Sequence, residues 1–112
     1  MSDIEKRRIE EFKDGWLVGN FHPAMITTPQ FEICYRKHLR GETPKAHYHK
    51  IGNEYTLIIR GHVRINDREF KTGDIITIPS YTVSEPLFLE DTEIMVFRGY
   101  SNTEDKYECI SK

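Results

Sequence analysis

Short alternations of apolar and polar residues dominate the chain after residue 15, and they predict β-strands. Apolar side chains alternate with mostly polar ones over 31–36, 55–60 and 62–66, which is the period of half-buried strands. Residues 75–79 are almost continuously apolar, a pattern typical of a buried strand. Turn sequences rich in Gly, Asn, Asp and Pro separate these runs. Many short strands at close spacing, without a second helix, predict an all-β sandwich or barrel.

The two ends of the chain depart from this pattern. Ser2 and Glu5 have the spacing of a capping box, and Gly15 is placed to end a helix that starts there. Such a helix would carry a thin apolar stripe of Ile4, Ile9 and Phe12. We therefore expect residues 1–14 to form a short helix or an extended arm. Residues 99–112 are polar and are expected to form a tail or an edge strand of a single domain, 1–112.

Composition excludes several classes of partner. The chain has 112 residues, enough for one domain with a core that needs no disulfides. A net charge of −2 gives no electrostatic reason to expect nucleic acid or an anionic membrane. The longest strictly apolar run, 94–97, is far too short to span a bilayer, and no secretory signal is visible. Cys34 and Cys109 are too few for a disulfide framework, so we expect a cytoplasmic protein with reduced thiols.

Residue types that bind metals gather between positions 47 and 54. His47 and His49 are two residues apart, so on a strand both imidazoles would point to the same face. Glu54 is five residues further on, an odd offset that would turn it to the opposite face of one continuous strand. The segment 50–53 contains Gly and Asn, which tolerate a tight connection. A hairpin there would make His49 and Glu54 cross-strand neighbours and would complete a metal site.

The same stretch resembles the first motif of the cupin superfamily. Every fixed position of that motif is filled at the right interval, by Gly41, His47, His49, Glu54 and Gly61. Gly73 and Pro79 match the start of the second motif, but Ser84 stands where that motif has its remaining metal-binding His. The resemblance implies a small single-domain cupin with a double-stranded β-helix, or jelly-roll, barrel. Because small cupins commonly pair, it also implies a homodimer.

The resemblance further implies one divalent transition metal bound by His47, His49 and Glu54. This ligand set suits Fe, Mn, Ni or Zn and leaves coordination positions open. One hypothesis is a metal-dependent enzyme, such as an oxygenase, isomerase or lyase, that acts on a small polar or anionic molecule. The alternatives are a non-catalytic module that binds or senses a small ligand such as a sugar or organic acid, and a cupin with a vestigial site. The fold class cannot choose among them.

Four other residues are candidates for this site. Tyr81 and Glu85 would transfer protons if their side chains reached the cavity. Ser84 would contact a metal-bound water or the substrate. Arg60 shares strand parity with Glu54, so its guanidinium would face the cavity and bind an anionic substrate. The alternative is an ordinary strand-end arginine in water, since arginine is seldom buried without a partner.

Overall fold

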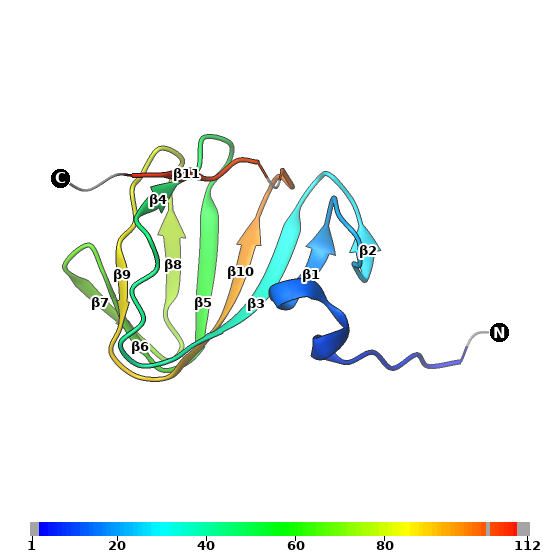
Figure 1. Ribbon diagram of the computed structural model, residues 1–112, viewed down its shortest axis with the longest axis horizontal. Helices are drawn as coiled ribbons and strands as arrows, with labels where there is room; N and C mark the ends of the chain where they lie inside the picture. The colour runs from blue at the N-terminus through cyan, green and yellow to red at the C-terminus, as the bar shows by residue number, and fades with distance from the viewer. Residues whose placement is uncertain (1–2, 103, 110–112) are drawn as a thin grey trace.

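Short β-strands make up most of the protein, as the computed structural model of residues 3–102 and 104–109 shows (Figure 1). The strands are β1 (Trp16–Gly19), β2 (Ile26–Thr27), β3 (Glu32–His38), β4 (His47–Tyr48), β5 (Glu54–Arg60), β6 (His62–Ile65), β7 (Arg68–Lys71), β8 (Ile75–Ile78), β9 (Pro86–Phe88), β10 (Thr92–Arg98) and β11 (Tyr107–Glu108). The all-β prediction is confirmed. No helix of the described residues is long and apolar enough to cross a membrane.

Three sheets enclose the interior of a barrel. The largest has six strands in the order β2-β1-β3-β10-β5-β8, and the others have the orders β7-β6-β9 and β11-β4. Side chains from all three sheets line a single cavity, so the sheets face one another around it. This arrangement is a double-stranded β-helix, as the resemblance to cupins implied.

Alternation along the strands decides which side chains form the core. On β5, Thr56 and Ile58 are buried, whereas their neighbours Tyr55 and Ile59 are exposed on the outer face. The buried apolar cluster is Ile58, Val63, Ile76, Phe88 and Ile94. These residues come from β5, β6, β8, β9 and β10, so the core joins the large sheet to the three-stranded one.

The N-terminal segment forms no α-helix within the described residues, so of the two expected alternatives, a short helix or an extended arm, the structure has the arm. Residues 3–8 are extended, and only two 3-10 turns follow, η1 (Ile9–Glu11) and η2 (Lys13–Gly15). The expected cap at Ser2 lies outside the described residues. Phe12 is buried while Ile4 is fully exposed, so the thin apolar stripe has too little to pack against. A short helix without packing on an apolar face is marginal in water, which favours the extended arm.

The predicted hairpin between β4 and β5 is also wrong. β5 pairs with β10 on one side and β8 on the other, so both of its edges are already occupied. β4 pairs instead with β11, and His47 makes an antiparallel bridge to Ser84. His49 and Glu54 are therefore not cross-strand neighbours. His49 lies just after β4 and Glu54 begins β5, which belongs to a different sheet, and Nε2 of His49 is 3.3 Å from Oε1 of Glu54.

Candidate metal centre

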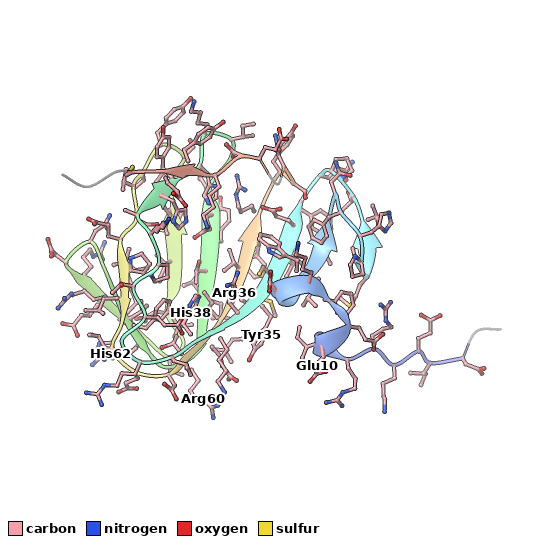
Figure 2. All side chains as sticks on the ribbon, viewed as in Figure 1. Glu10, Tyr35, Arg36, His38, Arg60 and His62 are labelled. Atoms are coloured by element: carbon pink, nitrogen blue, oxygen red, sulfur yellow. The ribbon has the colours of Figure 1, made fainter. Side chains whose placement is uncertain are left out.

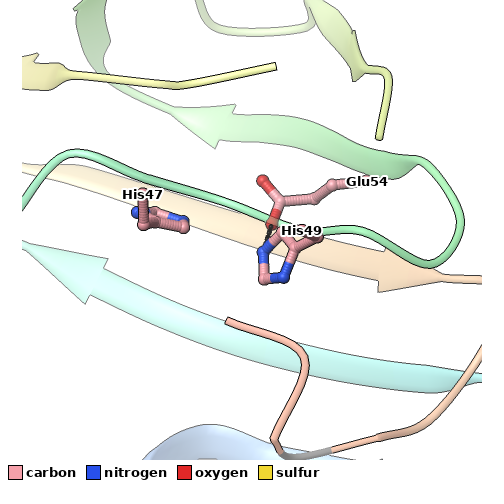
Figure 3. Close-up of side chains that lie close together, drawn as sticks. All are labelled: His47, His49 and Glu54. Atoms are coloured by element: carbon pink, nitrogen blue, oxygen red, sulfur yellow. Dashed lines mark ion pairs between the residues drawn. The ribbon is translucent and has the colours of Figure 1, made fainter. Parts of the chain in front are cut away.

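His47, His49 and Glu54 come together at one point of the barrel (Figure 3). One ligand atom from each lies within 4.8 Å of the other two. The Nε2 atom of His49 is 3.3 Å from Oε1 of Glu54, and the two imidazole rings lie edge to face with centroids 5.3 Å apart. Two imidazoles and one carboxylate in this arrangement could hold a metal ion.

Hydrogen bonds orient both imidazoles for this purpose. Nδ1 of His47 is 3.0 Å from the backbone carbonyl of Lys45, and Nδ1 of His49 contacts the carbonyl of Asp105. A carbonyl oxygen only accepts hydrogen bonds, so each Nδ1 must carry the proton. Each Nε2 then keeps its lone pair for a metal, which is how metal-binding histidines are usually held. The donor set therefore fits a divalent transition metal.

The charge states of the ligands fit a metal as well. In the metal-free protein, burial raises the pKa of Glu54, but a hydrogen bond from a protonated His49 and the positive charges of His49, His47 and Arg98 lower it by more. The net pKa of Glu54 lies below its ordinary value of 4.5. Burial lowers the pKa of His47 below 6.5, and the ammonium of Lys106 lowers it further. A carboxylate and a neutral imidazole are the forms that bind metals.

A buried network of ion pairs and hydrogen bonds holds the backbone next to this site. The guanidinium of Arg98 donates to Glu32 at 2.9 Å and to Asp105 at 2.5 Å, and all three side chains are at most 4% exposed. The Asp105 carboxylate also accepts the backbone N–H groups of Lys50 (2.9 Å) and Ile51 (3.0 Å). The network therefore fixes the segment that follows His49. No pattern in the sequence points to this network, because Asp105 lies in a polar stretch without periodicity.

Two residues of the cluster, His47 and Glu54, line a cavity of about 190 Å³ inside the barrel, whereas His49 is not among its lining residues. Most of its wall is apolar and includes Ile58, Val63, Ile78, Phe88, Ile94 and Val96. Its polar lining comprises Arg36, His38, His47, Glu54, Thr56, Ser84 and Lys106. Arg36, His38 and Lys106 were not predicted for the site. Arg36 and His38 have the same strand parity as Cys34, so alternation along β3 was the signal that pointed to them.

The other predicted site residues lie in different places, some in the cavity and some outside it. Ser84 is buried, lines the cavity and bridges to His47. Tyr81 is 66% exposed and its ring stacks near Tyr48, outside the cavity lining. Glu85 is exposed and lines a separate surface pocket. Proton transfer by Tyr81 or Glu85 required that they reach the cavity, and neither is among its lining residues.

Arg60 lies on the outer face of the sheet because a β-bulge reverses its parity. Ile58 pairs with Ile94 of β10, but Arg60 pairs with Glu93, so β5 carries one extra residue at Ile59. The guanidinium lies 3.4 Å from the Glu93 carboxylate, and its side chain is 73% exposed. Figure 2 shows Arg60 at the rim of the barrel and Arg36 nearer its middle. The expectation that Arg60 faces the cavity was wrong, and the solvent-exposed alternative describes it.

The fold and the three-residue cluster define a cupin-type barrel with a candidate metal centre. No protein-family model matches the sequence, and no curated protein matches it. Many solved structures match the fold. An uncharacterized conserved protein with a double-stranded β-helix domain from Klebsiella pneumoniae is 16% identical over 75% of this chain and 74% of its own, with a TM-score of 0.67.

Two other similar structures are larger proteins. The pirin YhhW of Escherichia coli, solved in complex with nickel(II), is 14% identical over 78% of this chain and 39% of its own, with a TM-score of 0.64. Oxalate decarboxylase of Bacillus subtilis is 18% identical over 71% of this chain and 24% of its own, with a TM-score of 0.62. These likenesses establish the cupin fold.

Proposed function

We propose that this protein is a metal-binding cupin that acts as a metal-dependent enzyme on a small anionic molecule. The observation that carries the proposal is the His47, His49 and Glu54 cluster, with each imidazole Nδ1 held by a backbone carbonyl. That arrangement leaves both Nε2 atoms and the carboxylate free to bind one ion. The names of two similar structures, a nickel complex and an oxalate decarboxylase, support metal binding and a small carboxylate ligand.

Each part of the cavity would have its own task. His47, His49 and Glu54 would hold Fe, Mn, Ni or Zn, and the bound metal would polarise a substrate oxygen as a Lewis acid. The apolar wall would exclude water and strengthen electrostatic interactions inside the cavity. Ser84 lines the cavity beside His47 and would donate a hydrogen bond to the bound ligand.

A non-catalytic module that binds a small ligand is the second candidate. It is favoured by one observation, namely that neither predicted proton-transfer residue, Tyr81 or Glu85, lines the cavity. A panel of small carboxylates incubated with the metal-loaded protein separates the two functions. Turnover of any member supports the enzyme, whereas saturable binding without turnover supports the module.

Elemental analysis tests the metal site directly. We expect about one transition-metal ion per chain after reconstitution with Fe, Mn, Ni or Zn, because the described residues contain one such three-residue cluster. His49→Ala and Glu54→Ala should each lose most of this metal, whereas the control His62→Ala, on β6, should retain it. Absence of stoichiometric metal from the wild-type protein after all four reconstitutions would refute the proposal. The homodimer stays a prediction, which light scattering of the same samples would test.

A further inference from the structure

Arg36 brings a positive charge into the cavity and forms no ion pair with any carboxylate of the described residues. It lies on the inner face of β3, where it pairs in register with Ile94 of β10, and it lines the cavity. Among the described residues, no carboxylate lies within 4.0 Å of its guanidinium, in contrast to Arg98 and Arg60. A half-buried guanidinium without a counterion is costly, unless an anion from outside pairs with it.

The charges of the residues that line the cavity also favour an anionic ligand. Glu54 is the one carboxylate among the residues that line it, whereas Arg36 and Lys106 are both cationic. Both imidazoles of the cluster add no negative charge. A divalent metal at the cluster would therefore leave the cavity with an excess of positive charge, which favours a ligand with more than one negative charge.

Strand register places Arg36 away from the cluster along the barrel. Glu54, Arg98 and Glu32 lie side by side on β5, β10 and β3. Arg36 is four residues beyond Glu32 on β3, so its backbone lies roughly 13 Å further along the strand at about 3.3 Å per residue. The long side chain can cover part of that span. The cavity wall between the two polar regions is the row of Cys34, Val96 and Thr56. The apolar Ile94 and Ile58 lie level with Arg36.

From this layout we infer that the natural ligand is a short-chain dicarboxylate. One carboxylate would lie at the metal held by the three-residue cluster, the short carbon chain would contact the apolar wall, and the second carboxylate would pair with Arg36. This inference rests on the proposed function, because it takes the metal to be present. Arg36 would then decide specificity between a diacid and a monoacid, since a guanidinium binds a carboxylate through two parallel hydrogen bonds.

Calorimetric titration of the metal-loaded protein tests the inference. The probes are succinate, glutarate and adipate, and the control ligand is the monoamide of whichever binds best. We expect the wild-type protein to prefer the diacid to its monoamide by roughly tenfold or more, as for a hydrogen bond to a charged group. Arg36→Met should keep its metal and lose that preference. Arg60→Met, which removes the same charge from the outer face, should keep both.

The possible results separate the two proposals. Metal uptake by the wild-type protein with no diacid binding, or with equal affinity for diacid and monoamide, overturns the dicarboxylate inference alone. A preference that persists in Arg36→Met also overturns it. Failure of the wild-type protein to take up metal overturns the proposed function instead. Should Arg36→Met fail to fold, as judged by its thermal melt, Arg36→Gln replaces it with the same expected loss of preference.

Discussion

The imidazole Nδ1 of His49 donates a hydrogen bond to the backbone carbonyl of Asp105, fifty-six residues further along the chain. This bond holds Nε2 of His49 toward Glu54, the other ligand that it contacts. The Asp105 carboxylate meanwhile accepts the backbone N–H groups of Lys50 and Ile51. One residue of the C-terminal segment thus fixes both the ring and the backbone of a candidate metal ligand.

Removal of the Asp105 carboxylate should therefore weaken metal binding. Asp105→Ala keeps the backbone carbonyl that contacts His49 but loses the carboxylate that holds the backbone of Lys50 and Ile51, so we expect it to lower metal affinity by roughly 10-fold, the lower end of the usual effect of losing a supporting group. Competition with a chromophoric chelator measures this affinity. Glu104→Ala is the matched control, because it removes an exposed neighbouring carboxylate. An Asp105→Ala protein that is folded and binds metal as tightly as the wild type would contradict the positioning role.

Substitution of two arginines on the same sheet should lower the free energy of unfolding by very different amounts. Arg98 is buried and pairs with Glu32 and Asp105, so Arg98→Met would leave two buried carboxylates without their counterion. We expect its free energy of unfolding to fall by about 3–5 kcal/mol. Arg60→Met removes an exposed ion pair with Glu93 and should cost about 1 kcal/mol or less. Urea unfolding measures both, and equal losses would show that burial of the network does not matter.

Stability of the metal-free protein should fall in mild acid. Burial lowers the pKa of His38, which stacks on Phe88 with ring centroids 4.1 Å apart, although the Glu42 carboxylate partly opposes this shift. Below the ordinary pKa of 6.5, the unfolded chain binds a proton that the folded chain does not bind. Stability is therefore complete above about pH 6.5 and is lost as the pH falls toward the pKa of the folded state. His47 contributes in the same direction, because burial lowers its pKa too.

Urea unfolding of the metal-free protein between pH 5 and 8 checks this dependence, a range in which histidine titrates. We expect His38→Gln to flatten the profile partly, since His47 remains. An unchanged profile in that variant would show that His38 does not supply the dependence. His22→Gln, at an exposed position, provides the matched control.

The alternation of apolar and polar residues was sufficient to predict strands, but it could not predict which strands pair with one another. Residue type, spacing and the resemblance to the first cupin motif pointed to His47, His49 and Glu54, although the hairpin that was expected to bring His49 and Glu54 together was wrong. The expected hairpin failed since β5 finds its partners in β8 and β10, which no local pattern could reveal. The expected inward orientation of Arg60 was wrong for another reason, because the extra residue at Ile59 reverses strand parity. Bulges and long-range pairing are decided by the packing of the whole barrel.

The residue at position 84 offers the sharpest test of how the candidate site differs from the four-ligand cupin pattern. Ser84 and His47 exchange backbone hydrogen bonds of 2.9 and 3.3 Å, and the Ser84 side chain lines the cavity. Ser84→His would place a third imidazole beside the cluster. We expect it to raise metal affinity by roughly tenfold or more, since a direct ligand should contribute at least as much as a group that orients one. Ser84→Ala should leave metal affinity nearly unchanged, because the three ligands remain.

Competition with a chelator measures the metal affinity of both variants. A Ser84→His protein that is folded but binds metal no tighter than the wild type would mean that position 84 does not face the ion. A large loss of affinity in Ser84→Ala would mean that the serine itself is a ligand.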